Sequence, residues 1–278
     1  MNIDSYYEMG AGHTFCQDYC LSGQVGEVSY LVGSDGCSAS KDTDIGARVL
    51  CHLTKKRIIK TVCELIPLTD LSIMTLQVHL LDMLNLFKET LALPSSAFDA
   101  TLFIVIEYKG KCLVLGWGDG VVIEKKKSGA TKIYRIEYTS GAPFYLSYFL
   151  DPKRREEYER QFSEDNVNHK TWELIAESSS SWDDDYRNDT IFVRLYDSEE
   201  LDLIAICSDG LTTYQSDKDC IDTAIRYTNY KNFAGDFVKR RMNKIKKENK
   251  IANSFHYDDI FCATIKFEEE SIDESPQV

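Results

Sequence analysis

The order of strand-like and helical runs constrains the fold of this chain more than any other feature. Strand-like runs occur in neighbouring pairs, and the two longest helical runs also follow one another directly. A parallel sheet built from βαβ units would require strands and helices to alternate. The paired order instead predicts an α+β fold, with mostly antiparallel sheets and helical layers on their outer faces. The predicted strands cover residues 28–34, 101–108, 111–117, 121–125, 132–138, 190–195, 201–207 and 260–267.

The helical runs are recognised by apolar residues that recur every three or four positions. Two long runs cover residues 44–65 and 70–91, and they are followed by Pro67 and Pro94. Because proline cannot continue a helix, these two residues mark where the runs end. Further helices are predicted at 153–162, 217–228 and 233–250.

Two segments of the sequence each allow a structural and a functional interpretation. The run SSSSWDDD at 178–185 predicts an exposed loop, and a mobile flap beside a functional site is the alternative. The basic stretch 239–250 predicts the solvated face of an amphipathic helix. A docking surface for phosphorylated or acidic partners is the alternative for that stretch.

The length and composition indicate one globular domain. The 278 residues are 43% hydrophobic and 28% charged, which is typical of a soluble protein with a sizeable core. No internal repeat or linker divides the chain, so we expect a single domain over residues 1–267. The acidic residues 268–278 are expected to form a disordered tail.

The charge and the distribution of apolar residues argue against several classes of protein. The net charge of −13 disfavours general binding to nucleic acid, which depends on neutralising phosphates. No apolar stretch reaches the ~18–20 residues of a membrane-spanning helix, and residues 1–12 do not resemble a signal peptide. Nine cysteines without a Cys-x-x-Cys pair are typical of reduced, buried thiols. We therefore expect a cytoplasmic protein without membrane or nucleic-acid partners, and we favour a monomer.

Four aspartates follow apolar runs or precede one, and each stands beside a glycine or a second aspartate. Asp35, Asp119 and Asp209 each precede a glycine, whereas Asp258 precedes Asp259 and the last predicted strand. Strand ends that lead into such turns present hard oxygen ligands at one edge of a sheet. Asp-Gly is also an ordinary turn dipeptide, and this alternative is strongest for Asp119. Together the four positions predict a divalent-cation site.

The chemistry of these residues suits magnesium or manganese. Both ions prefer octahedral coordination by carboxylates, carbonyls and water. Two such ions about 3.5–4 Å apart can share a bridging water, lower its pKa and bind both oxygens of an in-line displacement at phosphorus. Such a site also needs a group that holds the phosphate and a proton source for the leaving oxygen.

Seven short segments extend this pattern over nearly the whole chain. They are GHTFCQD (12–18), SDGCSAS (34–40), DIGAR (44–48), ATL (100–102), GDG (118–120), SDGL (208–211) and DDI (258–260). Their order resembles the metal-dependent serine/threonine phosphatases of the protein phosphatase 2C family, and most of all the compact bacterial branch. The resemblance implies a four-layer αββα sandwich of two antiparallel sheets flanked by helices. It also implies hydrolysis of phosphoserine and phosphothreonine in a protein substrate by a water that bridges two Mg²⁺ or Mn²⁺ ions.

The resemblance assigns ligand roles residue by residue. Asp35 would bridge both ions, and the carbonyl of Gly36 would bind the second. Asp209 and Asp258 would complete the protein ligands of the first ion. Asp119, together with Asp209, would hold a weaker third ion.

The first motif contains the positions where the chain departs from the family pattern. Asp18 matches an acidic position and would orient water bound to the metal. His13 stands where other members have a phosphate-binding arginine, and Gln17 stands where they have a glutamate ligand of the second ion. Cys37 occupies the position of a histidine proposed as general acid. These departures leave a second function open, a catalytically weak pseudophosphatase that binds a phosphorylated partner.

Overall fold

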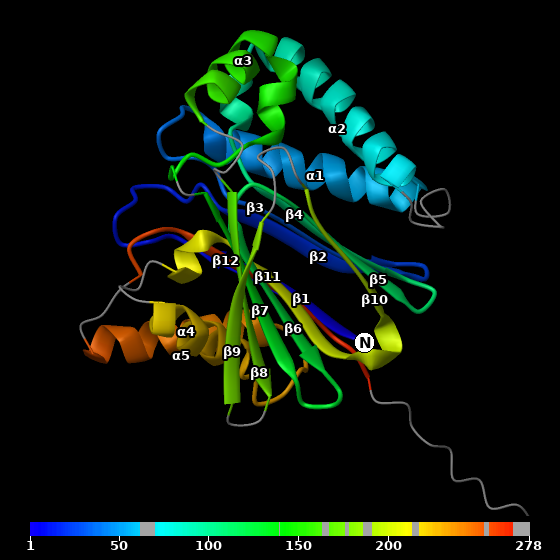
Figure 1. Cartoon of the computed structure of the whole chain (residues 1–278), viewed down its shortest axis with the longest axis vertical. Coiled ribbons are helices and arrows are strands. Elements are labelled where there is room, and N and C mark those ends of the chain that lie inside the picture. Colours follow the sequence, from blue (N-terminus) through cyan, green and yellow to red (C-terminus); the bar gives the residue numbers. More distant parts are fainter. Residues whose placement is uncertain are drawn as a thin grey trace, which may run out of the picture.

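The protein is an αββα sandwich in which two antiparallel sheets lie face to face between helical layers (Figure 1). The computed structural model describes residues 1–61, 70–138, 140–162, 167–175, 178–185, 191–212, 217–252 and 256–268. The predicted α+β fold class is confirmed. The predicted disordered tail lies, apart from Glu268, outside the described residues.

The larger sheet has seven strands in the order β1-β12-β11-β6-β7-β8-β9. All of its neighbouring strands pair antiparallel. The bounds are Asn2–Glu8 (β1), Ile260–Lys266 (β12), Leu201–Cys207 (β11), Gly120–Lys126 (β6), Thr131–Tyr138 (β7), Val167–Ile175 (β8) and Ser178–Asp185 (β9).

The smaller sheet has five strands in the order β10-β5-β4-β3-β2, again antiparallel throughout. A tight turn with positive φ at Lys109 and Gly110 joins β4 to β5, as expected for a two-residue hairpin. The bounds are Phe192–Asp197 (β10), Lys111–Trp117 (β5), Leu102–Tyr108 (β4), Val28–Ser34 (β3) and Tyr19–Val25 (β2).

Helices cover the outer faces of both sheets (Figure 1). Leu50 and Leu53 of α1 and Leu80 and Leu84 of α2 pack on the smaller sheet. Val238 and the other buried residues of α5, together with α4, pack on the larger sheet. A third apolar layer between the sheets completes the core. The helices are α1 (Thr43–Thr61), α2 (Asp70–Leu91), α3 (Pro152–Gln161), α4 (Asp217–Thr228) and α5 (Phe237–Ala252).

One prediction for the middle of the chain was wrong, and three strands were not predicted at all. The segment 178–185 is not a loop but strand β9, which pairs with β8 from Asp185 opposite Asn168 to Ser178 opposite Ile175. Serine and aspartate are rare in strands, so the local composition indicated a loop, whereas the pairing with β8 decides the structure. Strands β1, β2 and β8 were missed. The residues of β1 are polar and half-buried and gain their order from pairing with β12.

The described cysteines are unpaired with one another, and the described helices include no membrane span. The cysteines whose side chains are described are all free thiols, and five of those seven are buried. In the described part of the chain, no helix is both long and apolar enough to cross a bilayer.

The strand register brings four turns to one end of the sandwich. In the larger sheet Cys207, the last residue of β11, pairs with both Val121 of β6 and Cys262 of β12. In the smaller sheet Gly33, near the end of β3, lies against the ring of Phe261, where a Cβ atom would come within 2.2 Å. The ends of β3, β5 and β11 and the starts of β6 and β12 therefore meet where the two sheets face each other.

Candidate metal centre

Five acidic residues gather at this end of the sandwich. Asp18 precedes β2, Asp35 follows β3, Asp119 lies between β5 and β6, Asp209 follows β11, and Asp258 lies just before β12. The carboxyl group of Asp35 is within hydrogen-bonding reach of both Asp18 and Asp209. The structure thus brings together the five acidic positions that the sequence singled out.

Burial and mutual repulsion shift the ionisation of this cluster. Burial is the largest cause that raises the pKa of Asp18, Asp35, Asp119 and Asp209. Neighbouring carboxylates add to it, most clearly at Asp35, where three of them act in the same direction. Carboxyl groups in contact cannot all be ionised unless a cation lies between them. The cluster therefore holds either protons or cations.

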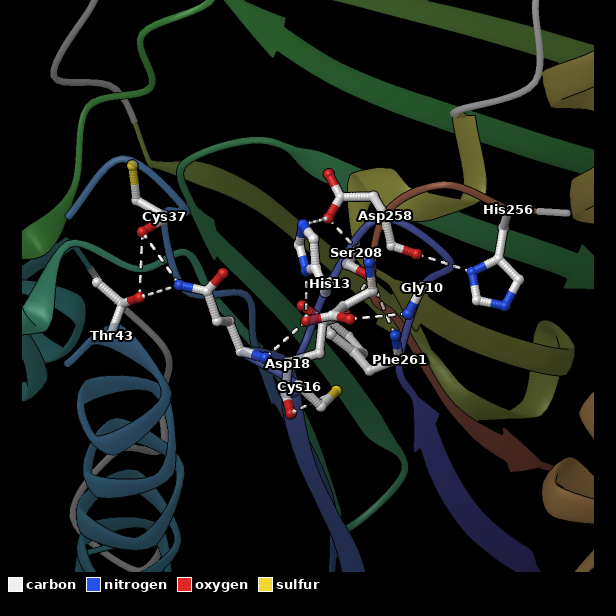
Figure 2. Close-up of polar contacts among 12 residues, drawn as sticks. Gly10, His13, Cys16, Asp18, Cys37, Thr43, Ser208, His256, Asp258 and Phe261 are labelled. Atoms are coloured by element: carbon white, nitrogen blue, oxygen red, sulfur yellow. Dashed lines mark hydrogen bonds and ion pairs between the residues drawn. The ribbon is translucent and has the colours of Figure 1, made fainter. Parts of the chain in front are cut away.

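The donor atoms fit a hard divalent cation. Asp18 accepts a hydrogen bond from Ser208 Oγ at 2.6 Å through Oδ2 (Figure 2), while its buried Oδ1 has no hydrogen-bond partner in the described part of the chain. Such acceptor oxygens suit Mg²⁺ or Mn²⁺ and the waters that these ions retain. Among the described residues, however, no three acidic, histidine or cysteine side chains form a ready-made metal-binding group. The cluster is a set of neighbouring carboxyl groups without coordination geometry.

Backbone contacts hold Asp35 and Gly36 in place. The N–H of Asp35 donates to Thr101 Oγ1 at 3.0 Å, and the N–H of Thr101 donates to the Asp35 carbonyl at 2.8 Å. Gly36 pairs with Ala100 in an isolated bridge, and a Cβ atom there would approach the Thr43 carbonyl to 2.8 Å. The segments 34–40, 44–48 and 100–102 of the sequence pattern therefore form one packed unit.

Asp258 and Asp259 are neighbours with different environments. The side chain of Asp258 is 39% exposed, whereas that of Asp259 is 1% exposed. Asp259 accepts hydrogen bonds from the N–H groups of Gly10 at 2.8 Å and Gln17 at 2.6 Å. A Cβ atom on Gly210 would lie 1.8 Å from the Asp259 carbonyl, so the turn after β11 packs directly on this residue. Asp259 ties the segment 10–17 to β12 and leaves Asp258 at the cluster.

His256 fixes the backbone of Asp258 from behind. Its Nδ1 lies 2.7 Å from the Asp258 carbonyl, and its Nε2 lies 3.0 Å from Glu8 Oε1 (Figure 2 shows the former contact). Both partners accept hydrogen bonds, so both ring nitrogens donate. Burial lowers the pKa of His256, whereas the hydrogen bonds to Glu8 and to the Asp258 carbonyl raise it. The hydrogen bonds outweigh burial, so the net shift of the pKa is upward. The structure thus gives His256 a contact beside the cluster.

His13 lies between the two carboxylates of the DDI motif. Its Nε2 is 3.3 Å from Asp258 Oδ1, and its Nδ1 is 2.9 Å from Asp259 Oδ2 (Figure 2). The second contact lacks the alignment of a hydrogen bond. His13, the predicted phosphate contact, therefore lies near the cluster, but its ring nitrogens already contact Asp258 and Asp259.

Hydrogen bonds orient the carboxamide of Gln17. Its Nε2 donates to Thr43 Oγ1 at 2.6 Å and lies 3.4 Å from the Cys37 carbonyl. Because a carbonyl only accepts, the NH₂ group must face Cys37, which leaves Oε1 as the atom for the predicted ligand role. A cavity of about 440 Å³ lies beside Gln17 and His13, between the segments 12–17 and 38–42.

Sequence analysis missed Tyr145, which is buried beside the cluster. Its hydroxyl is within hydrogen-bonding reach of the Cys37 side chain, with Asp119 and Asp35 nearby. Burial, followed by repulsion from Asp119 and Cys37, raises the pKa of Tyr145 well above its ordinary value. In the sequence this tyrosine belongs to an aromatic-rich run, which by itself indicates only core packing.

Buried Asp99 connects the segment that carries Tyr145 to the loop after Asp35. Its side chain accepts hydrogen bonds from Ser147 Oγ at 2.6 Å, Ser40 Oγ at 2.7 Å and Arg154 Nη2 at 2.7 Å. Its carbonyl accepts from the N–H of Cys37 at 2.8 Å. Two elements far apart in sequence are thereby fixed relative to each other.

A cation from β7 reaches the edge of the cluster and was also missed. Arg135 forms an ion pair of 2.8 Å with Glu137. Burial is the dominant influence on Asp209 and raises its pKa, while the charge of Arg135 opposes this shift. In a sequence, a charged residue at an alternate strand position indicates a solvated face, so no local signal distinguished Arg135.

Lowering the pH from about 8 to about 5.5 in the presence of a chelator is expected to raise the free energy of unfolding. The raised pKa values of Asp18, Asp35, Asp119 and Asp209 mean that the folded state binds protons before the unfolded state does. Their ionisation therefore costs stability, and this cost disappears as the pH falls toward the ordinary carboxyl range. Urea unfolding at several pH values measures the slope.

Two substitutions serve to assign that slope. Asp119→Asn is expected to flatten it, whereas Asp222→Asn, at an exposed position of α4, is expected to leave it unchanged. Stability that rises with pH over this interval would contradict the argument.

Solved structures with the same fold include bacterial and protozoan phosphatases. A bacterial serine phosphatase has 11% identity and a TM-score of 0.59, with 98% of this chain and 100% of that chain covered. The serine/threonine phosphatase Stp1 from Staphylococcus aureus has 14% identity and a TM-score of 0.56, with 97% and 96% covered. The serine-threonine phosphatase 2C from Toxoplasma gondii has 13% identity and a TM-score of 0.55, with 96% and 95% covered. At these identities the likeness concerns the fold alone.

The sequence itself carries the family assignment. A comparison with curated proteins gave no match. The family profile described as Protein phosphatase 2C matches residues 10–254. This range is most of the chain and contains every segment of the sequence pattern except DDI at 258–260, which begins four positions after its end. The chain belongs to the protein phosphatase 2C family.

Proposed function

We propose that the protein removes phosphate from serine and threonine residues of a protein substrate and that it requires Mg²⁺ or Mn²⁺. The observation that carries the proposal is the contact of the Asp18, Asp35 and Asp209 carboxyl groups at the meeting edge of the two sheets. Such contact calls for a proton or a cation between the groups. Membership of the protein phosphatase 2C family supports a cation that serves phosphate chemistry.

Acidic side chains from both sheets would hold the ions. Bound there, two ions would lower the pKa of a shared water and neutralise the phosphate. Asp35 is central, because it is the member of the smaller sheet that contacts both Asp18 and Asp209. Asp18 would orient the water through Oδ1, the buried oxygen that has no other partner among the described residues. The proposed ligands are Asp35, the Gly36 carbonyl, Asp209, Asp258, Gln17 and, for a weaker third ion, Asp119.

The cavity beside the cluster would receive the phosphorylated residue. His13 and Lys41 line it and are its two basic residues. His13 would leave its contacts with Asp258 and Asp259 and contact the phosphate instead. Lys41 is exposed and would attract the substrate without being fixed on it.

Tyr145 would donate a hydrogen bond to the oxygen that leaves phosphorus. The raised pKa of Tyr145 keeps its phenol protonated. The phenol therefore donates a hydrogen bond without transferring its proton. In the overall reaction, water forms one bond to phosphorus, the bond to the serine or threonine oxygen breaks, and a proton from water ends on that oxygen. A donor placed where charge develops lowers the barrier of such a step.

Tyr145→Phe is expected to lower kcat/KM for a phosphothreonine peptide by about 10- to 100-fold. The same change is expected to lower kcat/KM for p-nitrophenyl phosphate less than about 2-fold, because nitrophenolate is a good leaving group that needs little stabilisation. Tyr148→Phe is the matched control, since the Tyr148 ring stacks on Tyr145 at 6.1 Å. Equal losses on both substrates would indicate a structural role for Tyr145 and contradict the proposed donor.

Hydrolysis of both substrates with Mn²⁺, with Mg²⁺ and with chelator tests the proposed function itself. Turnover that depends on metal supports it. One observation favours the second candidate, a pseudophosphatase that binds a phosphorylated partner: His13, at the position of the phosphate-binding arginine, contacts Asp258 and Asp259. A folded protein that binds Mn²⁺ and a phosphopeptide but hydrolyses neither substrate would establish that alternative.

A further inference from the structure

A small basic cavity lies away from the acidic cluster, on the first half of α5. Its volume is about 190 Å³, and its lining includes four basic residues and two aromatic ones. They are Lys231, Arg240, Arg241, Lys244, Tyr230 and Phe237. In a chain with a net charge of −13, this concentration of positive charge contrasts with the rest of the protein.

Neither arginine of this cavity forms an ion pair with a carboxylate among the described residues. Arg240 Nη2 donates to Asn232 Oδ1 at 2.8 Å, and Arg241 Nε donates to the Arg226 carbonyl at 2.6 Å. Lys244 lies 3.4 Å from Glu248, but this carboxylate also pairs with Arg226 at 2.8 Å. Burial and the nearby charge of Arg226 lower the pKa of Arg241, whereas the charge of Glu248 raises it. The net shift is downward. The cavity therefore keeps an excess of positive charge.

The aromatic wall of the cavity is fixed by the sheet below it. The Tyr230 hydroxyl and Thr264 Oγ1 of β12 are hydrogen-bonded at 2.8 Å, and the Tyr230 ring meets Phe237 edge-on at 4.8 Å. The first N–H groups of α5 are already used, because Val238 and Lys239 donate to Asp4 Oδ2. The side-chain cations, rather than the end of the helix, thus make this an anion site.

The composition of the cavity favours a phosphate group. Guanidinium groups present paired N–H donors that match phosphate oxygens, and lysines add charge without fixed geometry. Ligand pockets for larger molecules usually measure about 300–1,000 Å³, so this one suits a phosphorylated side chain better than a nucleotide. The overall negative charge of the protein disfavours an extended nucleic acid.

We propose that this cavity binds the phosphate of a second phosphorylated residue on the protein substrate while the first occupies the acidic cluster. The proposal rests on the proposed phosphatase function. The second half of α5 leads from the cavity toward the cluster. Lys246 pairs with Glu8 at 3.1 Å, Glu8 contacts His256 at 3.0 Å, and His256 contacts the Asp258 carbonyl at 2.7 Å. Substrates with two phosphorylated residues several positions apart would engage both sites.

The test compares threonine peptides that carry one phosphate with peptides that carry two, about 6 to 12 residues apart. The second phosphate is expected to lower KM about 10-fold by raising the effective concentration of the substrate. Arg240→Gln combined with Lys244→Gln is expected to remove this advantage and to leave turnover of p-nitrophenyl phosphate unchanged. Lys247→Gln, also exposed on α5 but outside the cavity lining, is the matched control.

Direct binding separates this proposal from the proposed function. Fluorescence anisotropy with Mn²⁺ present, on labelled peptides that carry non-hydrolysable phosphonates in place of the phosphates, needs no turnover. The double variant is expected to lose the preference for two anionic groups. If the wild-type protein hydrolyses phosphopeptides without preferring the doubly phosphorylated ones, the cavity proposal fails and the phosphatase stands. If neither substrate is hydrolysed but the preference in binding persists, the phosphatase fails and the cavity stands. Binding of RNA or anionic vesicles that the double variant loses, with no peptide preference, would overturn the proposal.

Discussion

Asp209→Asn is expected to lower kcat on a phosphothreonine peptide by about 10³-fold while the protein stays folded. The proposed ions supply several kcal/mol of transition-state stabilisation, and each 1.36 kcal/mol corresponds to about tenfold in rate. An amide oxygen is a weaker ligand than a carboxylate, so the ions would bind less tightly. Titration calorimetry with Mn²⁺ and steady-state kinetics at saturating metal measure the two effects.

The same substitution carries a second, opposite expectation for stability. In the protein without metal, the Asp209 carboxyl is buried against Asp35, and the amide removes one of two like charges. The melting temperature in chelator is therefore expected to stay equal or to rise. Asp222→Asn, exposed on α4, controls for the change in net charge. A variant that keeps most of the wild-type activity would disprove the ligand role of Asp209, and a variant that unfolds would disprove the argument from repulsion.

Asp259→Ala is expected to destabilise the protein by about 3–5 kcal/mol, although its neighbour Asp258 is the proposed ligand. The alanine leaves the buried N–H groups of Gly10 and Gln17 without their acceptor and His13 without one of its two carboxylates. For a chain of this size, such a loss lowers the melting temperature by about 10 °C. Thermal and urea unfolding in chelator measure it independently of any activity.

Asp258→Ala is the matched comparison, because the change is chemically identical and one position away. The Asp258 side chain is 39% exposed, so its loss is expected to change stability by less than about 1 kcal/mol. Mn²⁺ affinity and turnover are expected to fall instead. If the two alanine variants lost stability to the same degree, the distinction between the adjacent aspartates would be wrong. Should Asp259→Ala fail to fold, Asp259→Asn, which keeps one acceptor oxygen, is expected to show a smaller loss.

The sequence predicted the architecture because most strands have strong local signals. The runs that became β3, β5 and β11 are apolar and buried on both faces, so their pattern does not depend on distant residues. The polar strands β1 and β9 depend on pairing with β12 and β8, and no local pattern reports such a partner. The order of these two strands is therefore tertiary in origin. Strands β2 and β8 were missed as well.

The same division applies to the candidate site. The Asp-Gly dipeptides mark turns after strands, so the sequence indicated which carboxylates would gather. It could not indicate that Asp259 points into a set of backbone N–H groups or that Tyr145 lies against Cys37, because both contacts join segments far apart in the chain. The family resemblance assigned a ligand role to Asp258 and none to Asp259, and the different exposure of the two side chains now gives this choice a physical reason.

The meeting of strand ends from both sheets has a consequence for how the protein opens. Apolar packing joins the inner faces of the sheets. Such packing resists separation of the sheets but is non-directional, so it does not hold particular strand ends together. At the end where Asp35 faces Asp209, repulsion between like charges weakens this joint, and a cation bound between them would turn it into a cross-link. Amide hydrogen exchange at the ends of β3 and β11 would then slow together on addition of metal, because neither strand end could open without releasing the ion that the other helps to hold.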